Sequence, residues 1–247
     1  MSVLRISTYN IHKGMSPLNR HHVLHQLKQA VQGLRADLLF LQEVQGEHTR
    51  RAARHADWPA LPQHVFLAPD HHHAYGCNAQ YRSGHHGNAL LSRFPISRIH
   101  NEDISVNRLE RRGLLHGAIV VNGWPQALHC LCVHLNLRAA DRRKQLLVLS
   151  DYVRQNVPDD APLIIAGDFN DWRGDACELL GQQLGMQEVF TSLHGRTVAS
   201  FPARLPLLAL DRIYLRGLVA RTAEVHGGRQ WQGLSDHLPL SATVQLQ

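Results

Sequence analysis

Apolar residues follow two different spacings along the first forty positions of the chain. From residue 4 to residue 9 they alternate with polar residues, and this period of two predicts a strand that ends at Asn10. Over residues 23–34 apolar side chains recur every three or four positions, which predicts an amphipathic helix. The apolar run 38–41 predicts a second strand, which ends at Gln42-Glu43.

Turn-forming residues then interrupt the pattern, so residues 57–87 are predicted to be rich in loops; they include Pro59, Pro62, Pro69, Gly76 and Gly84. Residues 139–153 are predicted to form a helix that buries Leu146, Leu149 and Val153. Short apolar runs elsewhere predict strands at 88–91, 114–121, 127–133, 163–166, 212–215, 219–225 and 238–246.

Many short strands with a few helices between them favour an α/β architecture of packed β-sheets flanked by helices, and they argue against a helical bundle. No internal repeat, low-complexity tract or Ser/Gly-rich linker divides the chain. We therefore expect a single domain over residues 1–247, a length that suits one hydrophobic core.

Composition narrows the class of protein further. Hydrophobic residues make up 44% and charged residues 19%, which is typical of a globular protein. The four cysteines show no paired metal-binding spacing, and the N-terminus has no apolar segment of signal-peptide length. No apolar run approaches the roughly 20 residues of a membrane-spanning helix. We expect a cytoplasmic protein, and a monomer is the favoured state.

The net charge is +6 with histidines neutral, and only three of the 26 basic residues are lysines. Arginine suits planar, bidentate contact with phosphate. Genomic base composition explains an arginine excess equally well. The charge therefore permits an anionic substrate without identifying one.

Polar residues repeatedly stand where predicted strands end or begin. Loops at strand ends are where a rigid scaffold places functional groups, and carboxylate and amide oxygens select hard cations such as Mg²⁺ or Mn²⁺. No cysteine lies in these segments, which argues against structural zinc. Each residue alone has an ordinary structural explanation, but together they predict one site; they are Asn10, Glu43, His134, Asp168, Asn170, Asp211, Asp236 and His237.

Seven segments carry a family resemblance, in order along residues 3–246. The chain resembles the endonuclease/exonuclease/phosphatase (deoxyribonuclease I-like) superfamily and is similar to its small bacterial YbhP-like branch. Gly167-Asp-Phe-Asn and Ser235-Asp-His are the most specific of these segments. The others are Tyr9-Asn-Ile-His, Leu41-Gln-Glu-Val, Gly87-Asn-Ala-Leu-Leu-Ser-Arg-Phe-Pro, Val133-His-Leu and Leu210-Asp-Arg-Ile-Tyr.

The resemblance implies a four-layered sandwich, in which two mixed β-sheets lie face to face with helices outside. It also implies that Glu43 is the principal ligand of a Mg²⁺ or Mn²⁺ ion, assisted by Asn10 and Asp236. By the same resemblance, Asp168 orients or deprotonates the attacking water, and Asn170 donates to a non-bridging phosphate oxygen.

Four further roles follow from the same resemblance. His237 would contact the scissile phosphate while Asp211 holds its ring, and His134 would lie near the phosphate or the leaving group. Asn88 would support the phosphate site. The physical chemistry agrees for His237, because a neighbouring carboxylate favours the protonated, positively charged imidazole.

Three arginines are weaker candidates for substrate binding. Arg112, beside Gly113, matches a position where the family often has a basic residue, but a solvated loop explains it too. Arg142 and Gln145 share one face of the predicted helix, and a salt-bridged surface helix is the alternative. Arg173 could reach substrate phosphate or simply pair with a nearby aspartate.

Several other features have structural explanations that we favour. Residues 71–73 are three adjacent histidines, and we expect them to lie in a loop without binding a metal. His85 and His86 directly precede the Gly87-Asn88 segment, so a contact with substrate is plausible there. Cys130 and Cys132 are expected in the core. The apolar segment 202–210 is expected to pack in the core, with a membrane-touching loop as the alternative.

These observations support a divalent-metal-dependent phosphoesterase that hydrolyses phosphodiester bonds with an activated water. A nuclease-like activity and a phosphodiesterase acting on phospholipids or other small diesters both remain open, because one fold serves many substrates. Leu208-Ala-Leu210 replaces the motif of the inositol phosphatases, which disfavours that substrate. A non-catalytic binding module would have lost some of the cleft residues, and none is missing.

Overall fold

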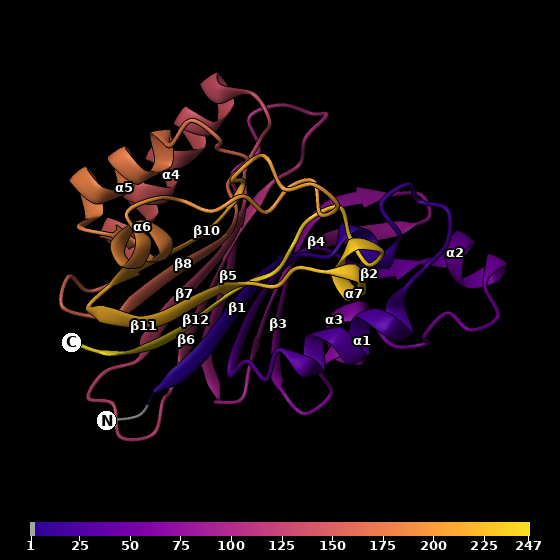
Figure 1. The fold of residues 1–247 in the computed structure, drawn as a ribbon, viewed down its shortest axis with the longest axis horizontal. Coiled ribbons are helices and arrows are strands. Elements are labelled where there is room, and N and C mark those ends of the chain that lie inside the picture. Colours follow the sequence, from indigo (N-terminus) through magenta and orange to yellow (C-terminus); the bar gives the residue numbers. More distant parts are fainter. Residues whose placement is uncertain (1–2) are drawn as a thin grey trace.

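Two six-stranded β-sheets lie face to face in the computed structural model, which describes residues 3–247 (Figure 1). The first sheet contains, in spatial order, β11 (Leu218–Val225), β12 (Leu240–Leu246), β1 (Leu4–Asn10), β2 (Leu38–His48), β4 (Gly84–Ser92) and β3 (His72–Tyr81). The second contains β5 (Ile96–Asp103), β6 (Gly113–Ile119), β7 (Leu128–His134), β8 (Leu163–Asp168), β10 (Asp211–Arg216) and β9 (Gln187–Glu188). Because β1–β2 and β7–β8 are parallel pairs among antiparallel ones, both sheets are mixed.

The main hydrophobic core lies between the facing sheets. Ile6 and Phe40 enter it from the first sheet, and Cys130, Cys132 and Ile164 enter it from the second. Side chains on one face of a strand alternate with those on the other, so each central strand also contributes to a second, outer core. The expectation that the two cysteines are buried is confirmed.

Helices cover the outer faces of the two sheets. On the first sheet, Leu27 and Val31 of the first long helix pack against the strands, and on the second sheet Leu146, Leu149 and Val153 do the same. The predicted four-layered α/β sandwich is therefore confirmed. The helical segments are η1 (His12–Gly14), α1 (Leu24–Gly33), α2 (Thr49–Arg54), α3 (Gln63–Leu67), α4 (Ala139–Asn156), α5 (Asp175–Leu184), α6 (Val189–His194) and α7 (Arg229–Gln232). Across residues 3–247, no helix combines the length and the apolarity that a membrane span requires.

The prediction of a loop-rich segment over residues 57–87 is wrong for most of its length. Helix α3, strand β3 and the beginning of β4 all lie there, and the expectation that the histidine triplet lies in a loop fails because His72 and His73 begin β3. Strand β3 is the edge of the first sheet, and many of its side chains are only partly buried. An edge strand needs little apolar alternation, so the sequence gives no strong strand signal.

Strand β2 is longer than predicted and passes through the position of Glu43. A bulge interrupts its pairing with β4 between Leu41 and Val44, and Glu43 adopts a φ of 56°. A bulge bends a strand and changes the direction of a side chain. The polar residues at 42–43 therefore mark an irregularity within the strand and not its end.

The expectation that residues 202–210 pack in the core is also wrong. Ala203 and Leu210 are buried, but Leu205, Leu207 and Leu208 are exposed to solvent. Backbone hydrogen bonds between Phe201 and Leu208 close this segment into a loop, so Leu205 and Leu207 project away from the sheets.

A buried chain of three polar side chains crosses the interface between α4 and the second sheet. His116 Nδ1 lies 3.0 Å from the Tyr152 hydroxyl, and His116 Nε2 lies 2.9 Å from His129 Nδ1. Burial lowers the pKa of His116 to about 4 and lowers that of His129 as well. Both rings are therefore neutral in the folded protein at pH 7.

We expect this chain to make the fold sensitive to acid. In the unfolded protein histidine has a pKa of about 6.5, so the unfolded state binds more protons below that pH. The contribution of His116 to the free energy of unfolding should be nearly constant above pH 6.5 and fall as the pH drops toward 4, by about 2 kcal/mol between pH 7 and pH 5. Denaturant unfolding of the wild type and of His116→Gln checks this, with His72→Gln as an exposed control. An equal loss between pH 7 and pH 5 in the wild type and His116→Gln would contradict the prediction.

Candidate functional site

The strand register brings polar side chains from the second sheet into one row. Strand β7 ends at His134 and β8 ends at Asp168, which are paired in the parallel ladder. Strand β10 runs in the opposite direction and begins at Asp211, which pairs with Asp168. Three residues that are far apart in the sequence therefore lie on neighbouring strands at the same end of the sheet.

His237, in the loop before β12, completes a buried cluster with the two aspartates. Its Nδ1 lies 2.8 Å from Asp211 Oδ2, and its Nε2 lies 3.7 Å from Asp168 Oδ2. The Ser200 hydroxyl donates to the same Asp211 oxygen, and the Phe201 ring lies 5.0 Å from the His237 ring. The three polar residues come from both halves of the sandwich and are all buried.

The charge of His237 follows from this arrangement. Burial alone would lower the pKa of the imidazole, but the carboxylates of Asp211 and Asp168 outweigh it and raise the pKa to about 10. In the described part of the chain, ligand atoms of Asp168, Asp211 and His237 lie close enough together to hold a metal ion. A protonated imidazole has no lone pair to offer a metal, so we interpret the cluster as an acid–base unit.

Asp168 lies at the centre of the site. Its Oδ2 accepts a hydrogen bond of 3.1 Å from Asn10 Nδ2 and lies 3.4 Å from His134 Nε2, while its Oδ1 accepts from the Asn170 backbone N–H at 3.0 Å. Burial, opposed by the charge of His237, raises the pKa of Asp168 to about 6. The carboxylate is thus ionised at neutral pH yet more basic than an exposed aspartate.

The turn after β8 fixes the position of Asn170. Asn170 has a φ of 50°, and its Nδ2 donates to the Leu135 carbonyl at 2.9 Å. Phe169, between Asp168 and Asn170 in the sequence, is fully buried in the outer core of the second sheet. One of the two amide protons of Asn170 is used by this bond, which leaves one for a ligand.

A second group of oxygen atoms adjoins the cluster. Glu43, on the bulge of β2, lies 3.0 Å from Lys13 Nζ through its Oε2. Asp236 Oδ1 lies 3.2 Å from His12 Nδ1, and Asn10 Oδ1 accepts from the His12 backbone N–H at 3.1 Å. Burial raises the pKa of Glu43, but the charge of Lys13 overcomes it and holds the pKa below the usual value. Burial also raises the pKa of Asp236, but the hydrogen bond with His12 helps to overcome it, and the pKa lies below its usual value.

These oxygen atoms fit a hard divalent cation. The donor set consists of carboxylate and amide oxygens without sulfur, which is the chemistry that Mg²⁺ and Mn²⁺ prefer. Both carboxylates are held in the ionised form, and Glu43 Oε2 is buried without a hydrogen bond of good geometry. A cation bound there would satisfy an oxygen that the protein itself leaves poorly satisfied.

His12 and Lys13 were not predicted from the sequence as members of the site. Both follow Asn10 after one intervening residue, Ile11, and adopt a left-handed backbone conformation, with φ of 45° and 57°. Gln63 Nε2 and Arg51 Nη1 donate to the Lys13 carbonyl and hold the turn in place. The signal in the sequence is their position shortly after the predicted ligand Asn10, and His12 closes the Tyr9-Asn-Ile-His segment.

Asn88 connects the two sheets beneath the site. Its Nδ2 donates to the carbonyls of Gly113 at 2.9 Å and of Cys132 at 3.2 Å, while its Oδ1 is buried without a partner. Both amide protons are therefore used within the protein. Asn88 supports the site by bridging the sheets, and its remaining free atom is an acceptor.

Arg112 lies close to the row formed by His134, Asp168 and Asp211. Its Nε donates to the Leu135 carbonyl at 3.2 Å, and its Nη2 lies 3.3 Å from Glu110 Oε1. After burial, the charge of Arg112 is the largest influence that lowers the pKa of His134. The expectation of a solvated loop is therefore wrong for Arg112, whose side chain is only 14% exposed.

Arg142 and Gln145 are buried, so the alternative of a salt-bridged surface helix is wrong. Arg142 donates to the Leu137 carbonyl, lies over the Trp172 ring at 5.0 Å and lies 3.9 Å from Asp171. Gln145 binds backbone groups of Asn136 and Ile104. Both shape the loop after β7.

The Arg173 side chain is exposed, and its backbone N–H donates to Asp171.

The two histidine segments differ in their relation to the site. Burial lowers the pKa of His86 to about 4, and the positive charge of Lys13, a residue of the site, contributes to this shift. His71 and His73 hydrogen-bond to the backbone carbonyls of Ala36 and Ala68. These two rings are thus engaged by the backbone of different segments.

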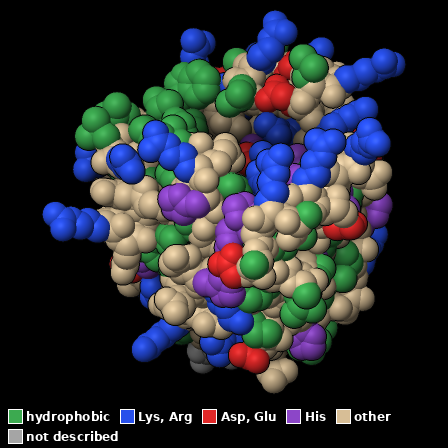
Figure 2. All heavy atoms as spheres, turned by 90° about the vertical axis from the view of Figure 1, so that its right-hand side faces the viewer, with side chains coloured by type: hydrophobic (Ala, Val, Ile, Leu, Met, Phe, Trp, Pro, Cys, Tyr) green, Lys and Arg blue, Asp and Glu red, His purple; other side chains and the backbone are tan. Residues whose placement is uncertain are grey.

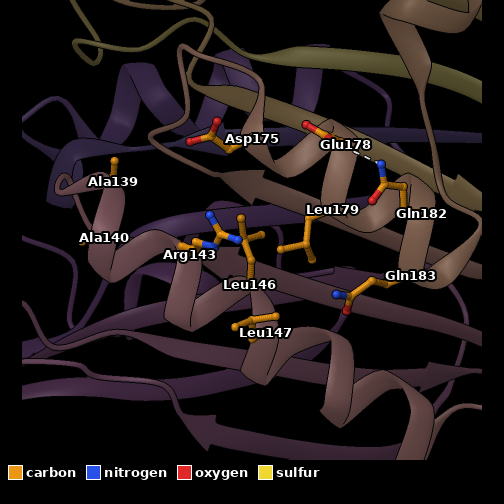
Figure 3. Close-up of a pocket in the computed structure, with 10 residues that line it drawn as sticks. All are labelled: Ala139, Ala140, Arg143, Leu146, Leu147, Asp175, Glu178, Leu179, Gln182 and Gln183. Atoms are coloured by element: carbon orange, nitrogen blue, oxygen red, sulfur yellow. Dashed lines mark hydrogen bonds between the residues drawn. The ribbon is translucent and has the colours of Figure 1, made fainter.

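Figure 2 shows the face that lies on the right in Figure 1. Lys and Arg side chains gather around a hollow in the upper half of this face, with histidines below it. A separate groove of about 510 Å³ lies between α4 and α5 (Figure 3). Leu146, Leu179 and Glu178 line this groove, and none of the predicted site residues does.

Residues 7–237 match the model of the Endonuclease/Exonuclease/phosphatase family. The chain belongs to this family. A YbhP protein of Escherichia coli (strain K12) is 45% identical over 244 residues, which cover 98% of this chain and 96% of that protein. The predicted placement in the YbhP-like branch is thereby confirmed. Members of this family are generally hydrolases that act on phosphoester bonds.

Solved structures show the same fold at low sequence identity. The endonuclease/exonuclease/phosphatase of Bacteroides vulgatus is 16% identical, with a TM-score of 0.79 and coverage of 100% of both chains. A structure of D. rerio TDP2 complexed with single strand DNA product is 18% identical, with a TM-score of 0.73 and coverage of 99% of this chain and 100% of that one.

We expect Asp211→Asn to lower the pKa of His237 by roughly one to three units, because one of the two carboxylates that favour the protonated ring loses its charge. NMR titration of the His237 imidazole in the presence of a chelator measures this pKa directly. Asp175→Asn, at an exposed position on α5, serves as the control. An unchanged His237 pKa in Asp211→Asn would show that Asp211 does not set the charge of the ring.

Proposed function

We propose that this protein is a divalent-metal-dependent phosphodiesterase that uses an activated water. The observation that carries the proposal is the adjacency of two groups. One is the buried acid–base cluster of Asp168, Asp211 and His237, and the other is the oxygen set that contains Glu43 and Asp236. Phosphodiester hydrolysis needs a base for water and positive charge for the phosphate oxygens, and the two groups supply both.

Asn10, Glu43 and Asp236 would hold the cation, which we propose to be Mg²⁺ or Mn²⁺. When bound, such a cation polarises a phosphate oxygen and offsets the negative charge that develops in the transition state. Lys13 already balances part of the carboxylate charge. We infer that Lys13 then remains beside Glu43 as an additional positive group near the phosphate.

Asp168 would orient the attacking water and accept its proton. Its pKa of about 6 keeps it ionised at neutral pH, and its contacts with Asn10 and His134 fix the direction of the carboxylate. Asn170 would donate its remaining amide proton to a non-bridging oxygen. A base with a pKa close to the working pH combines the ionised form with useful basicity.

His237 would donate a charged hydrogen bond to the scissile phosphate. Asp211 holds its Nδ1, so the proton on Nε2 is directed toward the site occupied by the substrate. His134 is neutral because burial lowers its pKa, which suits a position near the leaving group. We propose that Asn88 supports this arrangement indirectly and that Arg112 and Arg173 contact substrate phosphate, while Arg142 positions the loop around them.

A nuclease-like activity is one candidate, since the related fold of D. rerio TDP2 has been solved with a single strand DNA product. A phospholipid phosphodiesterase is the other. The non-catalytic alternative is disfavoured because every residue of the cluster is present, with Asp168 ionised and His237 protonated at neutral pH. A single domain over residues 1–247, a monomeric state and a cytoplasmic location remain predictions.

We expect hydrolysis of a soluble aryl phosphodiester to require Mg²⁺ or Mn²⁺ and to stop when a chelator is added. Glu43→Ala and His237→Ala should each lower kcat/KM by about a hundredfold or more, because the first would remove a ligand of the proposed cation and the second a positive charge beside the phosphate. Initial rates with and without metal measure this effect.

Two variants serve as controls for that experiment. Glu47→Ala removes an exposed carboxylate from the same strand as Glu43, and His194→Ala removes an exposed histidine from α6. Both should retain wild-type rates. Turnover that survives in Glu43→Ala and His237→Ala would remove these residues from the proposed mechanism.

A further inference from the structure

Four loops each place an exposed arginine directly beside an exposed large apolar side chain. The loops connect β5 to β6, β7 to α4, β8 to α5 and α6 to β10, and all lie at the end of the second sheet where β7 and β8 terminate. We call these residues, together with Leu207 and Leu208, the apolar–basic rim. Its four pairs are Arg108 with Leu109, Arg138 with Leu137, Arg173 with Trp172, and Arg204 with Leu205.

Contacts between the loops make the rim one surface. The Leu137 backbone N–H donates to Glu110 Oε1 in the β5–β6 loop, which joins the first two loops. The Arg142 guanidinium lies over the Trp172 ring and joins α4 to the third loop. Trp172, Leu207 and Leu208 line the same depression of about 660 Å³, which joins the third loop to the fourth. Figure 2 shows hydrophobic side chains beside Lys and Arg along its upper edge.

The rim is unusually apolar for a surface in contact with water. Among the described residues, six of the fourteen exposed large hydrophobic side chains lie on it, although its loops are a small part of the chain. Leu109 is 96% exposed, Leu207 69% and Leu205 64%. An exposed apolar surface of this kind marks a binding site for a partner that offers an apolar environment.

The charge of the rim identifies that partner. No described carboxylate lies within ion-pair distance of the exposed guanidinium groups of Arg108, Arg138, Arg173 or Arg204. The nearby Glu110 is already paired with Arg112, and Asp171 is buried beside Arg142. The rim therefore presents uncompensated positive charge next to apolar side chains, which is the combination that binds an anionic lipid surface.

A nucleic acid explains the arginines but not the leucines. Single strands bind to platforms on which bases stack, and those platforms are aromatic. Among the six exposed apolar residues of the rim, only Trp172 is aromatic. Aliphatic side chains gain free energy when they leave water for an apolar phase, and a bilayer offers that phase directly beside phosphate groups.

We propose that the apolar–basic rim docks on an anionic phospholipid surface and presents the proposed catalytic cluster to the phosphodiester of a phospholipid headgroup. The docking surface and the proposed catalytic cluster are adjacent. The segment that carries Leu205 and Leu207 also carries Ser200 and Phe201, which contact Asp211 and His237. The choice of a lipid substrate rests on the proposed phosphodiesterase activity, whereas the docking does not.

Sedimentation with vesicles tests the docking. Wild-type protein should bind vesicles that contain phosphatidylglycerol and phosphatidylcholine much more strongly than vesicles of phosphatidylcholine alone. Two variants should each weaken binding about tenfold or more, because one removes apolar insertion and the other removes charge attraction. These are Leu109→Ser/Leu205→Ser/Leu207→Ser and Arg108→Gln/Arg138→Gln/Arg204→Gln.

Matched substitutions away from the rim control for general effects. Ile99→Ser/Val120→Ser removes exposed apolar residues from β5 and from the opposite end of β6, and Arg35→Gln removes an exposed arginine near the start of β2. Both controls should bind vesicles like the wild type. The leucine variant should retain wild-type hydrolysis of the soluble aryl diester, which also shows that it is folded.

Three results would overturn the proposal. The first is wild-type protein that does not bind the anionic vesicles, or rim variants that bind them as the wild type does. The second is tight binding of a single-stranded oligonucleotide that depends on the arginines but not on the leucines, without vesicle binding. The third is a dimer in solution that the leucine variant dissociates, again without vesicle binding.

The docking and the chemistry can fail separately. If vesicles are bound but neither the soluble diester nor the phospholipid is hydrolysed, the phosphodiesterase proposal is wrong and the docking surface stands. If the soluble diester is hydrolysed but vesicles are neither bound nor hydrolysed, the catalytic proposal stands and the lipid surface is wrong.

Discussion

The ion pair between His237 and Asp211 is the interaction on which the candidate site depends. Burial of Asp168 and Asp211 side by side would force one of them to take up a proton unless a positive charge lay between them. The imidazolium of His237 supplies that charge, and the neighbouring carboxylates in turn keep it protonated. Neither charge state is stable in the interior without the other, so the cluster behaves as one unit.

The two facing sheets give this unit its rigidity. Asp168 and Asp211 are held by the ladder of the second sheet, while Asn10 and Glu43 belong to the first. Asn88 ties the sheets together beneath the site through two backbone carbonyls. A site built from strand ends on both sheets keeps its geometry because neither sheet can move without disturbing the shared core.

The loops beyond these strand ends have a different physical character. Among the described residues, they carry arginines without a carboxylate partner and leucines that are exposed to water, and both features are unfavourable in isolation. A protein surface tolerates such side chains because the rigid sandwich beneath them supplies most of the stability. The cluster around Asp168 is therefore buried and balanced in charge, whereas the apolar–basic rim, for example at Arg204 and Leu205, is exposed and carries unbalanced positive charge.

The sequence alone determined the central strands and long helices, because fully buried elements such as 163–166 carry strong apolar patterns. The resemblance also selected the polar residues that meet at the strand ends, including Asp168 and His237. Only the tertiary structure decided the edge strand β3, the bulge at Glu43, the entry of His12 and Lys13 into the site, and the exposure of Leu205 and Leu207. These features depend on which side chains meet across the fold, and the spacing of residues along the chain does not show which side chains will meet.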